Sequence, residues 1–407
     1  MRKIKKIIFT FCLALFAGFS LAQAQDPNPE AFITVWEPIG TSIKYPGIGA
    51  NYTIVVRDLS TNTVLKTIPD ASSTLNNPFE VTGLTPGVRY AFEVVPNTTT
   101  AADFNGFRVL QGTTEAPDEE KLNLVEISQW GTIKWSYNNG LFQAFKGCKN
   151  LELTATDQPV FASNMSLTSM FEGCTSLTGA GSSISDWDTS KVRLLNYVFM
   201  GATSFNQPLN WDVTNVNNFL GAFEGASSFN QDLGSWEMTG VNGVLRSANR
   251  MFDNSGMSPE NYAATLIGWA NNPATASGAA GSIPFTAAGV CYDKSATAAR
   301  DKLIGMGWAI TDAGVCTETS VELTPDNASK FSLLKNPVQE NAYFIFEPSS
   351  DGTKIIIADL SGKLIVSKPI AEGASETSIS LNHLPKGVYV ALHQKAQGKQ
   401  SVLKLIK

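Results

Sequence analysis

Histidine is nearly absent from this chain, and its scarcity excludes most histidine-dependent chemistry. Only two histidines occur in 407 residues, His383 and His393, and both lie near the C-terminus. Ser-His-acid and Cys-His mechanisms need an imidazole as the base, and many zinc sites need one as a ligand. No phosphate-binding glycine loop or dinucleotide-binding pattern occurs either. We therefore predict that the chain is not an enzyme and holds no histidine-ligated metal.

Long apolar runs are also missing, apart from one at the N-terminus. Four basic residues within the first six positions precede an apolar run over 7–21, and Ala22-Gln23-Ala24 follows with small-x-small spacing. This order is typical of a secretory signal peptide. We predict a signal peptide over 1–24, cleavage between Ala24 and Gln25, and no transmembrane segment in the mature chain. A membrane anchor is the alternative, but the run is short for a span.

Basic residues are scarce in the middle of the chain. The sequence has 36 acidic and 30 basic residues, and the basic ones concentrate in the signal peptide and after Ser329. The middle is therefore strongly acidic and repels phosphate backbones. Nucleic acid and anionic membranes are excluded as expected partners.

A repeat of about 25 residues occupies the centre of the chain. Its aromatic positions recur as Phe171, Phe199 and Phe223, followed by Trp187, Trp211 and Trp236. Such a period indicates a solenoid, in which each unit buries its apolar face against its neighbours. The phenylalanines are expected in the core. The tryptophans are expected to pack as a spine, the alternative being an exposed platform that stacks on sugar rings.

Polar residues also repeat in fixed positions. Asp188, Asp212 and Glu237 each follow a tryptophan, and Asn206 and Asn230 share another position. Unpaired carboxylates are costly to bury, so we expect the three acids on a surface that binds ligand. Three alternatives stay open for them, namely turn caps, a Ca²⁺ site and a glycosidase pair. The asparagines are expected to form a structural ladder between coils. No cofactor is expected, Ca²⁺ aside.

Four cysteines remain after the signal peptide, which suggests two disulfides in an exported chain. Cys148 and Cys174 each follow a glycine in the repeat position that holds Ala202 and Ala226 elsewhere. Equivalent positions on adjacent coils stack within disulfide reach. We predict Cys148–Cys174 and, by elimination, Cys291–Cys316. Buried free thiols are the alternative.

The chain divides into segments of different character, and the expected fold class is mainly β with several domains. Leu84-Thr85-Pro86-Gly87 before Tyr90 resembles the turn of fibronectin type III and other immunoglobulin-like sandwiches. A serine-proline pair at 258–259 predicts the start of a helix. The predicted segments are an immunoglobulin-like β-sandwich over 25–116, repeats over 117–255, a helical cap over 256–317, a linker over 318–329 and a small β-sandwich over 330–407.

The repeat has a recognisable form. Its Phe-x-Gly-Ala/Cys step, Ser-Phe-Asn-Gln and Trp-Asp-Val-Thr-Asn-Val resemble the BspA-type leucine-rich-repeat surface proteins of Bacteroidetes. The segment after the repeats, from Gly256 to Trp269, also resembles that family. The resemblance implies a leucine-rich-repeat solenoid and, in some members, binding of host matrix proteins or other microbes. Glu237 in place of aspartate departs from the pattern.

The last module resembles the type IX (Por) secretion C-terminal sorting domain. The matching segments are 334–338, 359–363, 384–389 and 404–407. The resemblance implies Sec export followed by type IX secretion, contact with that machinery through 330–407, and removal of the domain at the outer membrane. Release or attachment through surface lipopolysaccharide would follow.

These observations predict a secreted or cell-surface, non-catalytic adhesion protein that binds an extracellular protein, cell-surface or glycan ligand through its solenoid. Two alternatives remain. One is a carbohydrate-binding or carbohydrate-active surface protein, and the other is a structural coat component.

Overall fold

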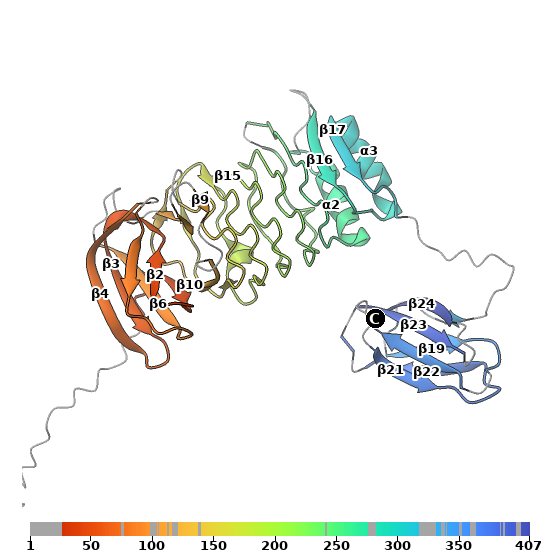
Figure 1. Cartoon of the computed structure of the whole chain (residues 1–407). Helices are drawn as coiled ribbons and strands as arrows, with labels where there is room; N and C mark the ends of the chain where they lie inside the picture. The colour runs from red at the N-terminus through yellow and green to blue at the C-terminus, as the bar shows by residue number, and fades with distance from the viewer. Residues whose placement is uncertain are drawn as a thin grey trace, which may run out of the picture. The chain divides into compact units, whose positions relative to one another are not determined.

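The structure is a computed structural model that divides into two compact units, one ending at Cys316 and the other beginning at Thr317. It describes residues 27–407 (Figure 1) except 75–76, 98–103, 105, 112–113, 116–120, 137–139, 241, 276–281, 317–330, 335–337, 339, 350–351, 359–363, 383, 386 and 396–399. The predicted signal peptide, its cleavage site and the linker lie outside the described residues. The expected mainly-β, multidomain architecture is confirmed.

The N-terminal part is a two-layer sandwich. Its long sheet has the order β12-β10-β1-β6-β3-β4, with β7 pairing to β3, and faces the two-stranded sheet β2-β5. Trp36, Tyr45 and Phe92 fill the space between the layers, and the Tyr45 and Phe92 rings stack with centroids 5.4 Å apart. The strands are β1 (Phe32–Trp36), β2 (Ser42–Tyr45), β3 (Gly47–Asp58), β4 (Thr63–Ser73), β5 (Phe79–Thr82), β6 (Tyr90–Pro96), β7 (Gly106–Phe107), β10 (Leu124–Gln129) and β12 (Glu152–Leu153), with β8 (Leu110–Gln111) and β9 (Thr114–Glu115) pairing separately.

The turn before β6 has the geometry that its sequence predicts. The Tyr90 hydroxyl accepts a hydrogen bond from the Thr85 amide at 3.0 Å, and Gly87 adopts a φ of 75°. A tyrosine at the start of a strand that bonds back to the preceding corner is a hallmark of immunoglobulin-like sandwiches.

The sandwich continues into the repeats without a break in the core. Strand β10 is antiparallel to β1 and parallel to β12, which belongs to the first coil. Trp130 and Trp135 contact Phe32 with ring centroids 5.7 and 4.9 Å apart. One buried cluster therefore extends from Phe32 to Trp308. The predicted boundary at 116/117 separates the sandwich from the repeats in sequence. In the structure, however, the two share one buried core.

The repeats form a stack of coils linked by short parallel pairings. These are β11 (Lys134–Trp135) with β13 (Val160–Phe161), and β14 (Met165–Ser166) with β15 (Val192–Leu194). Single-residue bridges carry the second ladder from Leu194 to Asn218 and on to Ser247. It continues from Ala248 into β16 (Ile283–Ala287) and then β17 (Trp308–Asp312). The described residues thus form one continuous ladder from 165 to 312.

Glycine sets how closely adjacent coils approach. Gly147, Gly173, Gly201 and Gly225 adopt φ angles of 67–78° at the same position of successive coils. A Cβ added at Gly201 would lie 3.8 Å from the Gly173 Cα. Beside this column, the rings of Phe171, Phe199 and Phe223 stack with centroids 5.7 Å apart. The left-handed turn therefore brings the aromatic rings of successive coils into register.

Two helices lie beyond the last regular coil of the stack (Figure 1). Helix α2 (Pro259–Asn271) begins at Ser258, whose hydroxyl accepts a bond from the Asn261 amide, as the serine-proline pair predicts. Helix α3 (Thr297–Gly305) follows a short 3-10 turn, η3 (Lys294–Ala296). The predicted Cys291–Cys316 disulfide is present, with its Cα atoms 4.9 Å apart.

The predicted Cys148–Cys174 disulfide is wrong. Both residues occupy adjacent coils as expected, but both are buried free thiols. The Cys174 Sγ lies 3.1 Å from the Phe145 carbonyl oxygen and donates to it. The two cysteines do occupy equivalent positions of adjacent coils, as predicted. The Cys174 thiol, however, donates to a backbone carbonyl and forms no bond with the Cys148 sulfur.

The C-terminal unit is a small β-sandwich, as predicted. One sheet has the order β18-β19-β22 and the other β21-β20-β23-β24. Phe344, Ile355 and Leu405 lie in the core between them. The strands are β18 (Ser332–Leu333), β19 (Asn341–Ile345), β20 (Lys354–Ala358), β21 (Leu364–Pro369), β22 (Glu376–Ser380), β23 (Val388–Gln394) and β24 (Gln400–Ile406).

Candidate functional site

The repeated carboxylates lie on the surface of the coil stack. Asp188, Asp212 and Glu237 are all exposed, while the tryptophan before each one is buried. One side chain of each pair therefore anchors the coil and the next projects into solvent. The expectation that the acids occupy a face and not the core is confirmed.

The two aspartates also shape their own turns. The Asp188 Oδ1 accepts bonds from the Ser190 amide at 3.1 Å and the Ser190 hydroxyl at 2.6 Å. Asp212 Oδ1 accepts the equivalent pair from Thr214 at 3.0 and 2.6 Å. The Ser190 bonds lower the pKa of Asp188, and the charge of Lys191 lowers it further. Each aspartate thus fixes its turn with one oxygen.

These carboxylates do not gather into a metal centre. Across the described residues, no group of three or more His, Cys, Asp or Glu side chains could hold an ion. Asp188 and Asp212 instead use Oδ1 in separate turns, one coil apart. The turn-cap alternative therefore describes these two residues.

The repeated tryptophans pack as a spine. Trp187, Trp211 and Trp236 are at most 3% exposed, and successive rings stack with centroids 6.0 and 6.4 Å apart. Trp211 Nε1 donates to the Ile184 carbonyl at 2.7 Å, and Trp236 Nε1 donates to that of Leu209 at 2.9 Å. An exposed sugar-stacking platform is excluded because no ring face of these three residues is open.

The asparagines form the expected ladder. The Asn206 Oδ1 accepts from the Asn230 amide at 2.8 Å, and Asn230 Oδ1 accepts from the Ser258 amide at 2.8 Å and the Asn261 Nδ2 at 2.9 Å. Asn230 thereby attaches the start of α2 to the last regular coil. These residues are structural.

Sequence reasoning missed the beginning of this ladder. Glu152 occupies the asparagine position of the first coil, and its carboxylate accepts bonds from the Thr178 and Gly179 amides. A glutamate and an asparagine look unrelated in sequence, although both present an acceptor. The equal spacing of Glu152 and Asn206 from the preceding Phe-x-Gly step was the sequence signal that could have identified this position.

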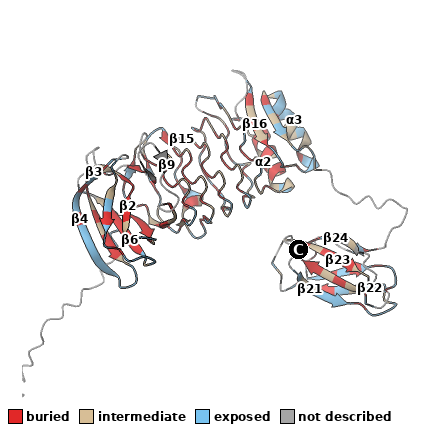
Figure 2. Ribbon diagram, in the orientation of Figure 1, coloured by how far each residue is buried: buried red, intermediate tan, exposed pale blue. Residues whose placement is uncertain are grey.

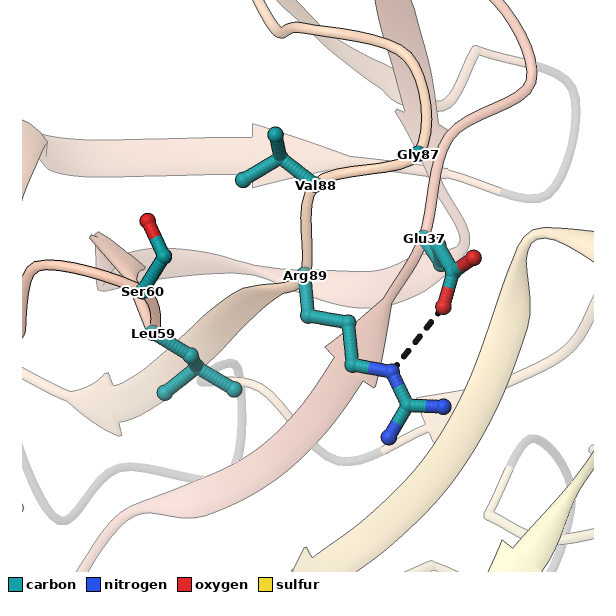
Figure 3. Close-up of a pocket in the computed structure, with 6 residues that line it drawn as sticks. All are labelled: Glu37, Leu59, Ser60, Gly87, Val88 and Arg89. Carbon is teal, nitrogen blue, oxygen red and sulfur yellow. Dashed lines mark hydrogen bonds and ion pairs between the residues drawn. The ribbon is translucent and has the colours of Figure 1, made fainter.

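The sandwich contributes a second candidate surface. A hollow of about 400 Å³ opens at one end of it, lined by Glu37, Leu59, Ser60, Gly87, Val88 and Arg89. Figure 3 shows the Arg89 and Glu37 side chains pointing toward each other, and their Nε and Oε2 atoms lie 2.9 Å apart. Leu59 is 42% exposed beside them. The mutual ion pair neutralises the charged side of this hollow.

The outer face of the sandwich is largely exposed at β4. Figure 2 shows this edge strand as largely exposed, and the first five residues of β4 are exposed, whereas every residue of β1 is buried. Val64 and Leu65 are among them. Within the part of the chain that the structure describes, no helix is long and apolar enough to cross a membrane.

Two family models match parts of the chain. Residues 139–264, which contain most of the coil stack, match a family described as Mycoplasma protein of unknown function, DUF285. Residues 335–407 match the secretion system C-terminal sorting domain. The C-terminal unit is thus similar to a secretion sorting domain, and it is called the sorting domain below. No curated protein and no solved structure matches the chain.

The sorting domain gives the chain its destination. As the tail recognised in type IX secretion of Bacteroidetes, it implies contact with that machinery and delivery of the chain outside the cell or to its surface. The sorting domain also has a buried core of its own, separate from the core of the preceding unit. The unit that ends at Cys316 is the part of the chain that the sorting domain follows, and it is called the cargo below.

Proposed function

We propose that the exported unit is a non-catalytic adhesion protein that binds a protein or cell-surface ligand through the carboxylate-bearing face of its coil stack. The coil stack would then be a BspA-type leucine-rich-repeat solenoid, with α2 and α3 as its helical cap. Residues 330–407 would be removed at the outer membrane after they have directed export.

One observation carries this proposal. Asp188 and Asp212 project from equivalent turns of adjacent coils, and Glu237 follows at the same position of the next coil. Oδ1 of each aspartate is held by its turn, so the direction of the carboxylate is fixed before any ligand arrives. Preorganised charges reduce the entropy lost on binding. A row of them favours a partner with basic side chains.

The test removes charge and keeps the turns. In the triple variant Asp188→Asn, Asp212→Asn and Glu237→Gln, each aspartate keeps an oxygen at Oδ1, so the fold is retained. Adhesion of purified cargo to host matrix proteins and to whole cells should fall by about tenfold or more. Surface changes of this kind usually alter the free energy of unfolding by less than about 0.5 kcal/mol.

A matched control carries the same charge change elsewhere. Glu260→Gln, Asp293→Asn and Asp301→Asn alter three exposed acids at the helical end, and Asp293 Oδ1 also caps a turn, at Ser295. This control should adhere normally. Unchanged adhesion by the first variant would exclude its face and direct attention to the hollow at Arg89 and Leu59.

A further inference from the structure

A cationic hollow lies beside the carboxylate-bearing face. It has a volume of about 220 Å³. Buried Val192 forms its apolar side. Its polar lining comes from three successive coils and consists of Ser163, Asn164, Ser190, Lys191, Arg193 and Asn215. Two positive charges therefore converge at one point of a strongly acidic chain.

Neither cation is neutralised by an ion pair with a described residue. The ion pairs of the coil stack join Lys146 to Glu172 and Arg250 to Glu224, and Lys191 and Arg193 take no part in them. The charge of Lys191 lowers the pKa of Asp188, so the Asp188 carboxylate offsets part of that charge. Its Oδ1 is already engaged by Ser190. The hollow thus keeps a positive charge open to a ligand.

The lining is held in place by the coil stack. The Arg193 Nη1 donates to Asn164 Oδ1 at 3.4 Å, and Asn215 Nδ2 donates to the Ser190 carbonyl at 2.8 Å. Below them the backbone is fixed by the β14–β15 pairing, whose register shifts between Met165 and Ser166. The shift pairs Met165 with Val192 and Ser166 with Leu194, so Arg193 occupies a bulge at the edge of the hollow. Bulges redirect a side chain out of the ladder.

We propose that this hollow binds the carboxylate of an acidic saccharide, such as a uronic acid residue. Arg193 and Lys191 would pair with the carboxylate, since a guanidinium matches a carboxylate in geometry. The amide groups of Asn164 and Asn215 and the hydroxyl of Ser163 would bond the ring hydroxyls. At about 220 Å³, the hollow is smaller than sites for drug-sized ligands, roughly 300–1,000 Å³, and suits one sugar ring.

The polar lining favours a saccharide over an acidic peptide. Besides the two cations, two asparagines and two serines can exchange hydrogen bonds, and only Val192 offers apolar contact. A glutamate peptide carries fewer hydroxyl groups than a sugar ring, so it would make fewer hydrogen bonds to this lining. A neutral sugar would leave the two cations without a counter-charge, and the buried tryptophan spine offers no ring face to compensate.

This inference goes beyond the proposed adhesion, because the two neighbouring surfaces carry opposite charge and take different ligands. One variant should affect saccharide binding and protein adhesion in opposite directions. Asp188→Asn removes a negative charge next to the hollow, so it should strengthen binding of an acidic saccharide while it weakens adhesion to a basic protein.

The experiment is calorimetric titration of the full chain with a galacturonic acid trisaccharide, a neutral galactose trisaccharide and a glutamate tripeptide. The acidic saccharide should bind about tenfold or more tightly than either of the others. Its affinity should fall as salt is raised, because the contact is between charges. The double variant Lys191→Gln and Arg193→Gln should lose about tenfold or more of that affinity.

The same titration includes a control variant. Lys149→Gln with Lys302→Gln removes two exposed cations outside the hollow and should bind normally. Thermal unfolding of both double variants should match the parent. Equal binding of acidic and neutral saccharides, or unchanged binding by the Lys191 and Arg193 variant, would overturn the site. Tighter binding of the tripeptide would overturn the assignment to a saccharide.

Discussion

At the scale of single residues, one repeat position holds either a small side chain or a thiol. Cys148, Cys174, Ala202 and Ala226 all occupy it, and all four are fully buried. Burial raises the pKa of the Cys148 thiol to about 12 and also raises that of Cys174. The reactive thiolate is therefore scarce at neutral pH, and both residues act as small apolar side chains.

Labelling tests this state directly. Iodoacetamide should leave Cys148 and Cys174 unmodified in the native protein, because the thiols are buried and protonated. In denaturant without reductant, peptide mapping should find these two labelled, and adding reductant should label Cys291 and Cys316 as well. A linked Cys148–Cys174 peptide would show that the pair is oxidised and refute the free-thiol arrangement.

At the scale of elements, the helical end depends on the stack beneath it. Trp269 of α2 donates its Nε1 to the Leu233 carbonyl at 2.8 Å, which is the bond that Trp236 makes to Leu209 one coil earlier. Asn230 accepts from both Ser258 and Asn261 at the start of the helix. The helix thus continues two columns of the repeats, the tryptophan spine and the asparagine ladder.

Removing Asn230 should therefore loosen the helical end. Asn230→Ala leaves the Ser258 amide without its acceptor and leaves the Asn261 side chain with only the Asn230 backbone carbonyl. We expect a loss of about 1–3 kcal/mol in the free energy of unfolding of the larger unit. Urea titration measures the loss. Asn230→Asp keeps the acceptor and should lose less.

The control for this change is Asn210→Ala. Asn210 Nδ2 makes one exposed bond, to Asp186 Oδ1 at 2.9 Å. It should cost under about 1 kcal/mol. Equal losses at the two positions would mean that the attachment of α2 does not depend on the ladder.

At the scale of the whole molecule, the two units have separate cores and the C-terminal one contains a buried histidine. His393 is 2% exposed and lies between Phe331 and Phe346, with ring centroids 5.1 and 4.9 Å away. Burial lowers its pKa below the ordinary 6.5, and the charge of Lys395 lowers it further. The unfolded sorting domain therefore binds a proton more readily than the folded one.

The sorting domain should accordingly lose stability in acid. The neutral His393 stabilises the folded domain fully above about pH 6.5, the pKa of histidine in the unfolded chain. This stabilisation is lost as the pH falls through the lower pKa of His393 in the folded domain. Calorimetry of the full chain should show two transitions, and the one from the sorting domain should move to lower temperature between about pH 7.5 and about pH 5.5.

His393→Phe isolates this cause, since phenylalanine keeps the aromatic stack and cannot titrate. It should flatten the pH dependence of that transition. An unchanged slope would assign the dependence to other groups of the sorting domain.

Export is a second property of the whole molecule. Deletion of residues 331–407 should retain the chain in the periplasm, because the type IX machinery would have no sorting domain to contact. Cell fractionation measures the location. Mass spectrometry of surface material should find a start near Gln25 and a missing C-terminal unit, whereas an intact C-terminus would contradict removal of the domain.

The sequence by itself determined the features that repeat or are local. The coil period, the buried phenylalanine and tryptophan columns, the exposed aspartates and the start of α2 at Ser258 all follow from spacing and side-chain chemistry. The sorting domain was predicted from its motifs. The Cys291–Cys316 disulfide was predicted only by elimination from a Cys148–Cys174 pair that does not form, so the sequence did not determine it. The features of the repeats, of the α2 start and of the sorting motifs depend on residues close in sequence or on a pattern that recurs at a fixed interval, so they needed no long-range geometry.

Only the tertiary structure decided how distant segments meet. The β10–β1 pairing joins the sandwich to the coils, and the Cys174 thiol donates to the Phe145 carbonyl and forms no disulfide with Cys148. The cationic hollow brings together residues of three coils beside the register shift in β14–β15, where Arg193 donates to Asn164. These outcomes depend on strand register and side-chain direction across coils, which small differences in packing energy select and a repeat period alone leaves open.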